Sequence, residues 1–206
     1  MKIVTLVLAA VFTFCNQITV SAQNCTLTCP DNIIVSAKAS QEGTEVIFPK
    51  YNAPAECGTI IFTPASGSFF RLGSHSIIVI SSTGQKCSFT ITVTDNEAPE
   101  LSEITLTRTN LWPASNKMKK VGLNYTVKDN AEDVKTVVTV YSNAIDGIKD
   151  YEIIDNRNLR LLSSRLSNGS PRMFTITVTA TDLAGNKTVR TTTIAVSNTM
   201  TAKKNL

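Results

Sequence analysis

The chain has 206 residues, of which 42% are hydrophobic and 17% charged, and its formal net charge is +4. This length is enough for one large or two ordinary domains, each with its own core. The net charge is small and there is no dense basic stripe beside aromatic residues, so the composition excludes a typical nucleic-acid-binding domain.

The first 22 residues are predicted to be a secretory signal peptide. Lys2 supplies a positive charge, Ile3 to Phe14 form an apolar run, and Val20-Ser21-Ala22 is a small-residue cleavage motif. The run has about a dozen residues, which is too short to span a bilayer, and no second run of that kind follows. Lipidation of Cys15 is an alternative, but the large aromatic before it does not fit such a signal. We therefore expect an exported protein, secreted or at the cell surface, with no membrane span.

Four cysteines follow this segment, and all lie in the first half of the chain: Cys25, Cys29, Cys57 and Cys87. An even number of cysteines in an exported chain favours two disulfides in an oxidising compartment. A zinc site is the alternative, but a CxxxC spacing with two distant cysteines is loose for one. The second half of the chain has no cysteine, so core packing must stabilise it.

Short alternating segments predict β-strands along the rest of the chain. In the stretch Thr90 to Thr94, Ile91 and Val93 face one side of an extended strand and the threonines face the other. Similar segments, separated by Gly, Pro, Asn and Asp, are residues 77–80, 121–127, 134–141, 175–181 and 189–196. The pattern predicts an all-β protein of two tandem immunoglobulin-like antiparallel β-sandwiches after a cleaved signal peptide.

The hexapeptide FTITVT occurs twice, at residues 89–94 and 174–179, but the two copies are not equivalent. When the turns are aligned, residues 76–95 correspond to residues 177–196, each a strand, a Gly-centred turn and a second strand. The repeated unit is therefore the last hairpin of each sandwich. The predicted organisation is a signal peptide 1–22, a first sandwich 23–97, a linker 98–103, a second sandwich 104–198 and a polar tail 199–206.

The first sandwich resembles a hyalin repeat (HYR) module over nearly all of Cys25 to Pro99. The resemblance is carried, in order, by CTLTCPDNIIVSA, VIFPKYNAPAECGTI, TPASGSFFRLGSHSIIVI and CSFTITVTDNEAP. It implies an immunoglobulin-like sandwich found in extracellular, often multi-domain, adhesion-type proteins. The turn at residues 82–86 lacks the Asp that many such modules have, which weakens any ion-binding role for that turn.

Residues 101–198 are similar to the domain that often follows a hyalin repeat in secreted bacterial proteins. The phrases that carry this similarity are NLWPASNKM, NYTVKDNAEDVKTVVTVYS and the stretch from DYEIID to DLAGNKT. The first phrase commonly reads LWPPNHK in that family, so Ala114 and Ser115 replace the usual residues while Lys117 is retained. The similarity implies a bacterial, extracellular protein and no particular activity.

The same fold suggests how the cysteines pair. Cys29 precedes the first strand and Cys87 begins the last, and these two strands are neighbours in this fold, which predicts a Cys29–Cys87 disulfide. Cys25 then pairs with Cys57 by elimination, among the three pairings that four cysteines allow.

Residues suited to catalysis are few. His75, the single histidine, stands at a turn before a strand with no Ser-His-Asp or Cys-His arrangement around it, so we interpret it as a surface residue. No sequence context lowers the pKa of a cysteine thiol. We therefore expect no enzymatic activity.

Loop carboxylates point instead to calcium, which binds six to eight oxygen atoms. The DNEAP linker is similar to the calcium-binding joints of cadherin-type repeats, where the ion stiffens the chain. The predicted ligands are Asp95, Asn96, Glu97, Asp129, Asp133 and Asp182, with Glu100 and Glu132 beside them. The alternative is that Asp and Asn occur here because their side chains bond nearby backbone in turns.

The only tryptophan, Trp112, is a further candidate for ligand binding. In the sequence Leu111-Trp112-Pro113 we expect a core anchor, since tryptophan is buried on average. The alternative is an exposed sugar-stacking platform beside Tyr125 or Tyr141.

Three hypotheses on function follow. The first is a non-catalytic secreted or cell-surface protein that acts as an adhesion or protein-interaction module, with an extracellular protein or glycan as its ligand. The second is a calcium-stiffened structural spacer. The third is a carbohydrate-binding accessory module.

Overall fold

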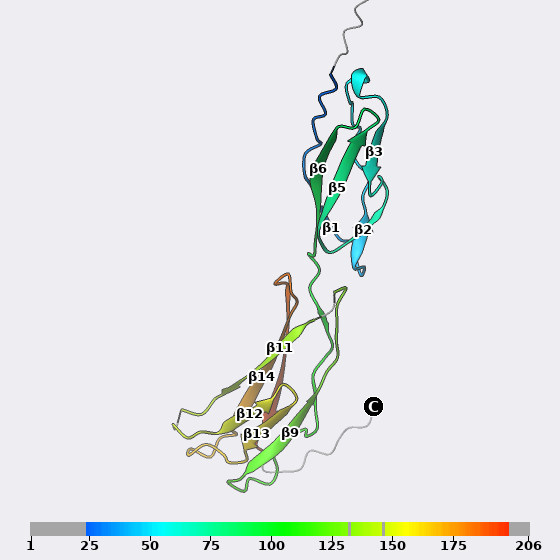
Figure 1. The fold of residues 1–206 in the computed structure, drawn as a ribbon. Helices are drawn as coiled ribbons and strands as arrows, with labels where there is room; N and C mark the ends of the chain where they lie inside the picture. The colour runs from blue at the N-terminus through cyan, green and yellow to red at the C-terminus, as the bar shows by residue number, and fades with distance from the viewer. Residues whose placement is uncertain (1–23, 132, 146, 198–206) are drawn as a thin grey trace, which may run out of the picture.

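The structure is a computed structural model that describes residues 24–131, 133–145 and 147–197. The predicted signal peptide, the polar tail and Glu132 lie outside the described residues. Within the described ranges the chain forms β-strands and one short 3-10 helix, η1 (Ala55–Cys57), and no α-helix. The chain is all-β, as predicted, and Figure 1 shows two β bodies arranged end to end. No helix in these ranges has the length and apolar character needed to cross a membrane.

The first body has one sheet in the order β1-β6-β5-β3 and a small second sheet, β2-β4. Its strands are β1 (Ile33–Ser36), β2 (Gly43–Glu45), β3 (Ile60–Thr63), β4 (Phe69–Arg71), β5 (Gly73–Ser81) and β6 (Lys86–Thr94). The sequence pattern predicted an antiparallel sheet. The sheet is instead mixed, because β1 runs parallel to β6. Parallel pairing needs a long connection, and here nearly the whole body lies between the two strands.

Strand alternation builds the first core as expected. In β6 the side chains of Phe89, Ile91 and Val93 are buried, whereas the threonines between them are only partly covered. They pack with Val46, Phe70, Ile77 and Val79. Burying each such side chain contributes about 1.5–3 kcal/mol, so this cluster is the main source of stability for the first body.

Two disulfides close the first body. They join Cys25 to Cys57 and Cys29 to Cys87, the pairs predicted above, across sequence separations of 32 and 58 residues. The first ties the segment before β1 to η1, and the second ties it to β6. Disulfides persist in oxidising compartments, so the pairing agrees with export from the cell.

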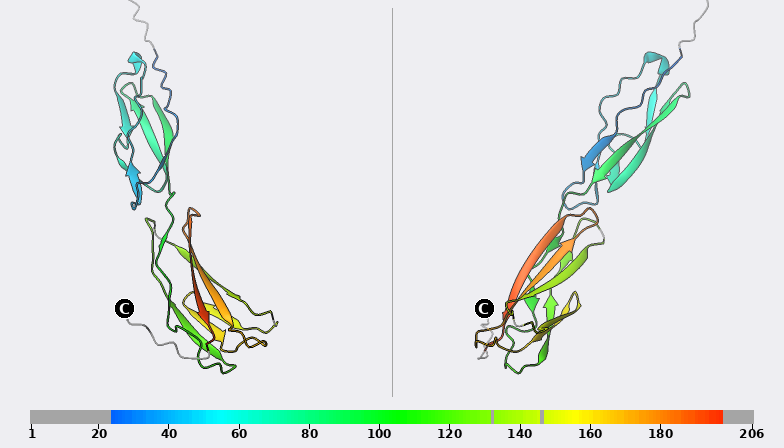
Figure 2. Two further views of the ribbon diagram at one scale, coloured as in Figure 1. Left: turned by 180° about the vertical axis from the view of Figure 1, so that it is seen from behind. Right: turned by 90° about the vertical axis from the view of Figure 1, so that its left-hand side faces the viewer.

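The second body pairs the sheet β11-β14-β15 with the sheet β12-β13-β9-β8, and the two-stranded ladder β10-β7 lies at the end nearest the first body (Figures 1 and 2). Its strands are β7 (Glu100–Leu101), β8 (Thr105–Leu106), β9 (Met118–Asn124), β10 (Val127–Lys128), β11 (Lys135–Ser142), β12 (Tyr151–Asp155), β13 (Asn158–Leu162), β14 (Met173–Thr181) and β15 (Lys187–Ala195). The two FTITVT copies lie in β6 and β14. They occupy the second strand of the β5-β6 hairpin and the first strand of the β14-β15 hairpin.

The core of the second body excludes the tryptophan. Phe174, Ile176 and Val178 of β14 are fully buried with Leu111, while Trp112 is 37% exposed. The expectation that Trp112 is a core anchor is therefore wrong: Leu111 fills that role. Among the described residues, no aromatic ring stacks on Trp112.

A buried ion pair lies at the end of the second body far from the joint. Arg172 and Asp150 are 1% and 4% exposed, and Nη1 of the arginine lies 2.5 Å from Oδ2 of the aspartate. Ser142 also donates a hydrogen bond to the carboxylate, and Nε of Arg172 donates to the carbonyl of Ser164 at 3.1 Å. These partners compensate both buried charges.

Candidate metal centre

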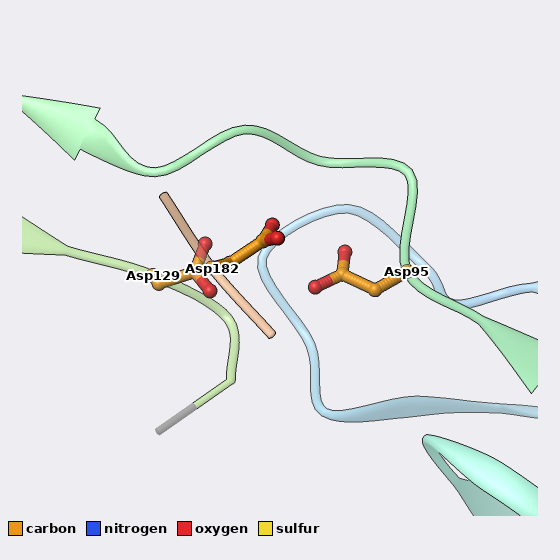
Figure 3. A group of neighbouring side chains, drawn as sticks. All are labelled: Asp95, Asp129 and Asp182. Atoms are coloured by element: carbon orange, nitrogen blue, oxygen red, sulfur yellow. The ribbon is translucent and has the colours of Figure 1, made fainter. Parts of the chain in front are cut away.

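Three aspartates from distant parts of the chain meet where the two bodies join. Asp95, Asp129 and Asp182 each follow directly after a strand, namely β6, β10 and β14. One carboxylate oxygen from each lies within 4.8 Å of those of the other two. Figure 3 shows the carboxylate of Asp95, from the end of the first body, pointing toward that of Asp182 in the second.

Two asparagine side chains connect these aspartates across the joint. Nδ2 of Asn130 donates to Oδ1 of Asp95 at 3.1 Å. Nδ2 of Asn186 donates to the main-chain carbonyl of Asp95 at 3.3 Å and to Oδ2 of Asp182 at 2.8 Å. The end of β6 is therefore bonded to two loops of the second body.

Two oxygen atoms beside the cluster have no hydrogen-bond donor. Oδ1 of Asp129 and Oδ1 of Asn130 are buried, and neither accepts a hydrogen bond in the described part of the chain. Leaving a buried acceptor unsatisfied costs about 1–3 kcal/mol, and more when it carries charge. A cation bound by Asp129 would satisfy its Oδ1.

The negative charges of the three carboxylates repel one another. Burial raises the pKa of Asp129, and the charges of Asp95 and Asp182 raise it further, against the lowering effect of the hydrogen bond from the amide of Ala131. None of the ion pairs between described residues includes these three aspartates. Lys128 lines an adjoining cavity of about 220 Å³ together with Asp129. The cluster therefore has unbalanced negative charge.

The donor set suits a hard divalent cation. All available atoms are carboxylate, amide and carbonyl oxygens, the ligands that Ca²⁺ prefers, and there is no thiolate or imidazole to favour zinc or copper. Each carboxylate can bind through one or two oxygens, so the three aspartates can reach the lower end of the roughly six to eight ligand atoms that calcium takes.

The other predicted ligands lie outside the cluster. Nδ2 of Asn96 donates to Oγ of Ser36, and the carboxylate of Glu97 accepts a 2.7 Å hydrogen bond from the amide of Ser40. The amide of Glu97 in turn donates to Asp95 at 3.0 Å, closing a turn that directs Glu97 toward the first body. Asp133 is exposed, with a φ of 73°, and is not part of the cluster.

Asn130 and Asn186 were missed by the sequence analysis as site residues. The sequence carries no specific signal for them, because the dipeptide Asp-Asn also occurs at residues 31–32 and 155–156, and Asn186 follows a glycine. His75 lies in β5 with Nε2 2.7 Å from the carbonyl of Arg71 and its ring against Phe70, and it is not part of the cluster.

Comparison with known proteins finds similar solved structures but no related family or curated protein. No family model matches the chain, and no curated protein matches it. Among solved structures it is similar to cadherin domains 3–6 of protocadherin gamma B2 (14% identity, 84% of this chain and 46% of that one, TM-score 0.34). It is also similar to domains 1–3 of Drosophila N-cadherin (15%, 85% and 66%, TM-score 0.30) and to the human desmocollin-1 ectodomain (13%, 84% and 37%, TM-score 0.28). The chain spans half or less of the length of the protocadherin structures. At these identities and TM-scores, no function follows from the likeness.

Proposed function

We propose that this chain is a non-catalytic, extracellular module of an adhesion or interaction protein, and that Ca²⁺ bound by Asp95, Asp129 and Asp182 fixes its two sandwiches relative to each other. The ion would make the pair a stiff spacer that holds binding loops at a set distance and angle.

The convergence of the three aspartates carries this proposal. Like charges this close repel, by about 1 kcal/mol per pair even at the dielectric constant of water. A fold that brings three of them together, with buried oxygens left without donors, is stabilised by a counter-ion. Because Asp95 belongs to the first body and Asp129 and Asp182 to the second, the same ion would hold the joint.

Turn chemistry explains only part of this arrangement. Asp95 accepts a hydrogen bond from the amide of Glu97, and Asp182 accepts one from the amide of Asn186 at 2.8 Å, as Asp commonly does in turns. Neither turn requires the three carboxylates to meet. Nor does turn formation explain the unsatisfied Oδ1 of Asp129.

The disulfides support the extracellular part of the proposal. Calcium sites of extracellular modules bind with dissociation constants on the order of 10⁻⁴ to 10⁻³ M. A site of that strength is filled outside the cell, where the Cys25–Cys57 and Cys29–Cys87 bonds also persist.

Isothermal titration calorimetry with CaCl₂ tests the proposal on the oxidised, exported chain. We expect one ion per chain and a weakening of about tenfold or more when Asp95→Asn removes one charged ligand. Asp31→Asn is the matched control, because Asp31 is an exposed aspartate of the first body outside the cluster. Absence of binding at millimolar calcium, or equal weakening by both variants, would refute the site.

A further inference from the structure

A second feature of the molecule, independent of the calcium site, is a shallow groove on the second body. It has two adjoining sections, with volumes of about 650 and 550 Å³, that share Thr107, Gly122 and Asn158 in their lining. The sections run along β9 from Asn124 to Lys120, a length of about 14 Å at the rise of an extended strand.

The side chain of Thr107 lies over Gly122 at the middle of the groove. A Cβ atom at this position would lie 2.8 Å from Cγ2 of Thr107, so a side chain here would displace the threonine. Oγ1 of Thr107 accepts a 2.8 Å hydrogen bond from the amide of Gly122. Asn158 of β13 stands opposite Gly122 in the ladder and forms the other wall. A ligand in the groove would therefore meet the side chains of Thr107 and Asn158 at this point.

Cations line the groove. Arg108 and Lys120 flank the smaller section, and Nε of Arg108 donates to the carbonyl of Lys120 at 3.0 Å, which holds the guanidinium beside the groove. No carboxylate lines this section. Arg157 lines the larger section.

Positive charge is crowded around the smaller section. The neighbouring Lys119 has its pKa lowered by burial and by the charge of Arg108, and its Nζ donates to the main-chain carbonyls of Trp112 and Pro113. Lys119 lies on the opposite face of β9 from Lys120, so it adds to the positive field without contacting a ligand in the groove.

The acidic groups near the groove have their own partners. Glu103, in the lining of the larger section, lies 3.4 Å from Nε of Arg190. Asp155, which interacts with Lys120, accepts hydrogen bonds from the side chain of Asn158 at 3.0 Å and from the amide of Arg157 at 2.6 Å. The donors to Asp155 are neutral, so Asp155 keeps its negative charge. The cations Arg108, Lys120, Arg157 and Arg190 still outnumber the anions Glu103 and Asp155, so the charge around the groove is positive.

The groove has no exposed aromatic ring on which a neutral sugar could stack. Tyr125, its only aromatic residue, is 6% exposed, and the guanidinium of Arg157 covers the ring at 3.6 Å from its centroid. Recognition here must rely on charge and hydrogen bonds.

We propose that this groove binds a linear acidic polysaccharide. Arg108 and Lys120 would bind sulfate or carboxylate groups, since such charge-assisted hydrogen bonds are the strong ones, and Thr107 and Asn158 would bind sugar hydroxyls. The open, elongated shape fits a chain that enters and leaves the site, and an enclosed small molecule would need a deeper cavity.

Binding of a sulfated octasaccharide to the full exported chain at about 0.15 M salt tests this proposal. We expect the double variant Arg108→Ala/Lys120→Ala to bind about tenfold more weakly or worse, a difference of about 1.4 kcal/mol. Lys50→Ala/Lys86→Ala is the matched control, because it removes the same charge from exposed positions of the first body, and its affinity should change less than twofold.

Other outcomes overturn the proposal. They are no binding at this salt concentration, equal weakening by the control variant, or equal binding of a neutral dextran. A DNA oligomer of matched charge that binds as tightly would assign the groove to nucleic acid. Circular dichroism of each variant verifies that it is folded, so that lost binding is assigned to the groove.

Discussion

Replacing Asp129 with asparagine should change the stability of the protein in opposite directions with and without calcium. In chelator the variant should be more stable than the wild type, because it removes one charge from a cluster of three. In calcium it should be less stable than the wild type, because the same charge is a ligand. A side chain that merely forms a turn would show no such reversal.

The size of each effect follows from the geometry. Two charges 4.8 Å apart repel by about 1 kcal/mol at the dielectric constant of water and by about 3.5 kcal/mol at an effective value of 20. Asp129 is partly exposed, so the lower figure applies, and removing its repulsion from two neighbours should stabilise the apo protein by about 1–2 kcal/mol. With calcium at ten to a hundred times Kd, the wild type gains about 1.4–2.7 kcal/mol that the variant loses in large part.

Thermal and urea unfolding of the wild type, Asp129→Asn and the control Asp31→Asn, each in chelator and in calcium, measure both signs. For a chain of this size about 1 kcal/mol corresponds to a change in Tm of about 2–4 °C. The control should leave both curves unchanged. If Asp129→Asn destabilises the protein equally in both conditions, the cluster is not a metal site.

Three further predictions concern pH, the disulfides and the buried ion pair. Since burial and the neighbouring charges raise the native pKa of Asp129 above its ordinary 3.8, the apo wild type should gain stability relative to Asp129→Asn as the pH falls through that raised value. Unfolding free energies of both proteins in chelator measure this difference, and a flat profile contradicts it. Replacing Cys29 and Cys87 with alanine opens a loop of 58 residues and should lower the free energy of unfolding by about 4 kcal/mol in urea; a loss below about 1 kcal/mol would show that the bond constrains little. Arg172→Met leaves Asp150 buried without its partner and should cost about 3–5 kcal/mol by the same assay, and a loss of under 1 kcal/mol would mean that water reaches the carboxylate.

Much of the fold could be predicted because strand alternation is local. The period-two pattern of Phe89 to Thr94 identifies both the strand and its buried face, and Ile91 and Val93 lie in the core as that pattern indicates. The disulfide pairs could be predicted because the fold makes the strands after Cys29 and at Cys87 neighbours.

The site could be predicted only in part, because it depends on how two bodies meet. The sequence shows that Asp95, Asp129 and Asp182 follow strands, but their convergence needs the ends of β6, β10 and β14 to face one another. Glu97 looks equally suitable in the sequence, yet the local turn bonds it to Ser40. The local sequence pattern therefore identifies the type of residue that can bind the ion. It does not show which of several neighbouring acidic residues lies at the site.

Trp112 illustrates the same limit in the core. Leu111 and Trp112 are adjacent, so an extended backbone can bury only one of them on a given face. Average burial favours tryptophan, but in this chain Leu111 is buried and Trp112 is 37% exposed. The choice is made by the facing strands, which a single sequence does not specify.

The most direct test of a calcium-fixed joint is nuclear magnetic resonance of the weakly aligned protein, in which residual dipolar couplings report the orientation of each body. We predict that in millimolar calcium the backbone amides of β1 to β6 and those of β8 to β15 fit a single alignment tensor, as for one rigid unit. In chelator the two sets should need different tensors, because the three carboxylates at the joint then repel one another. Couplings that are the same in calcium and in chelator would contradict the account.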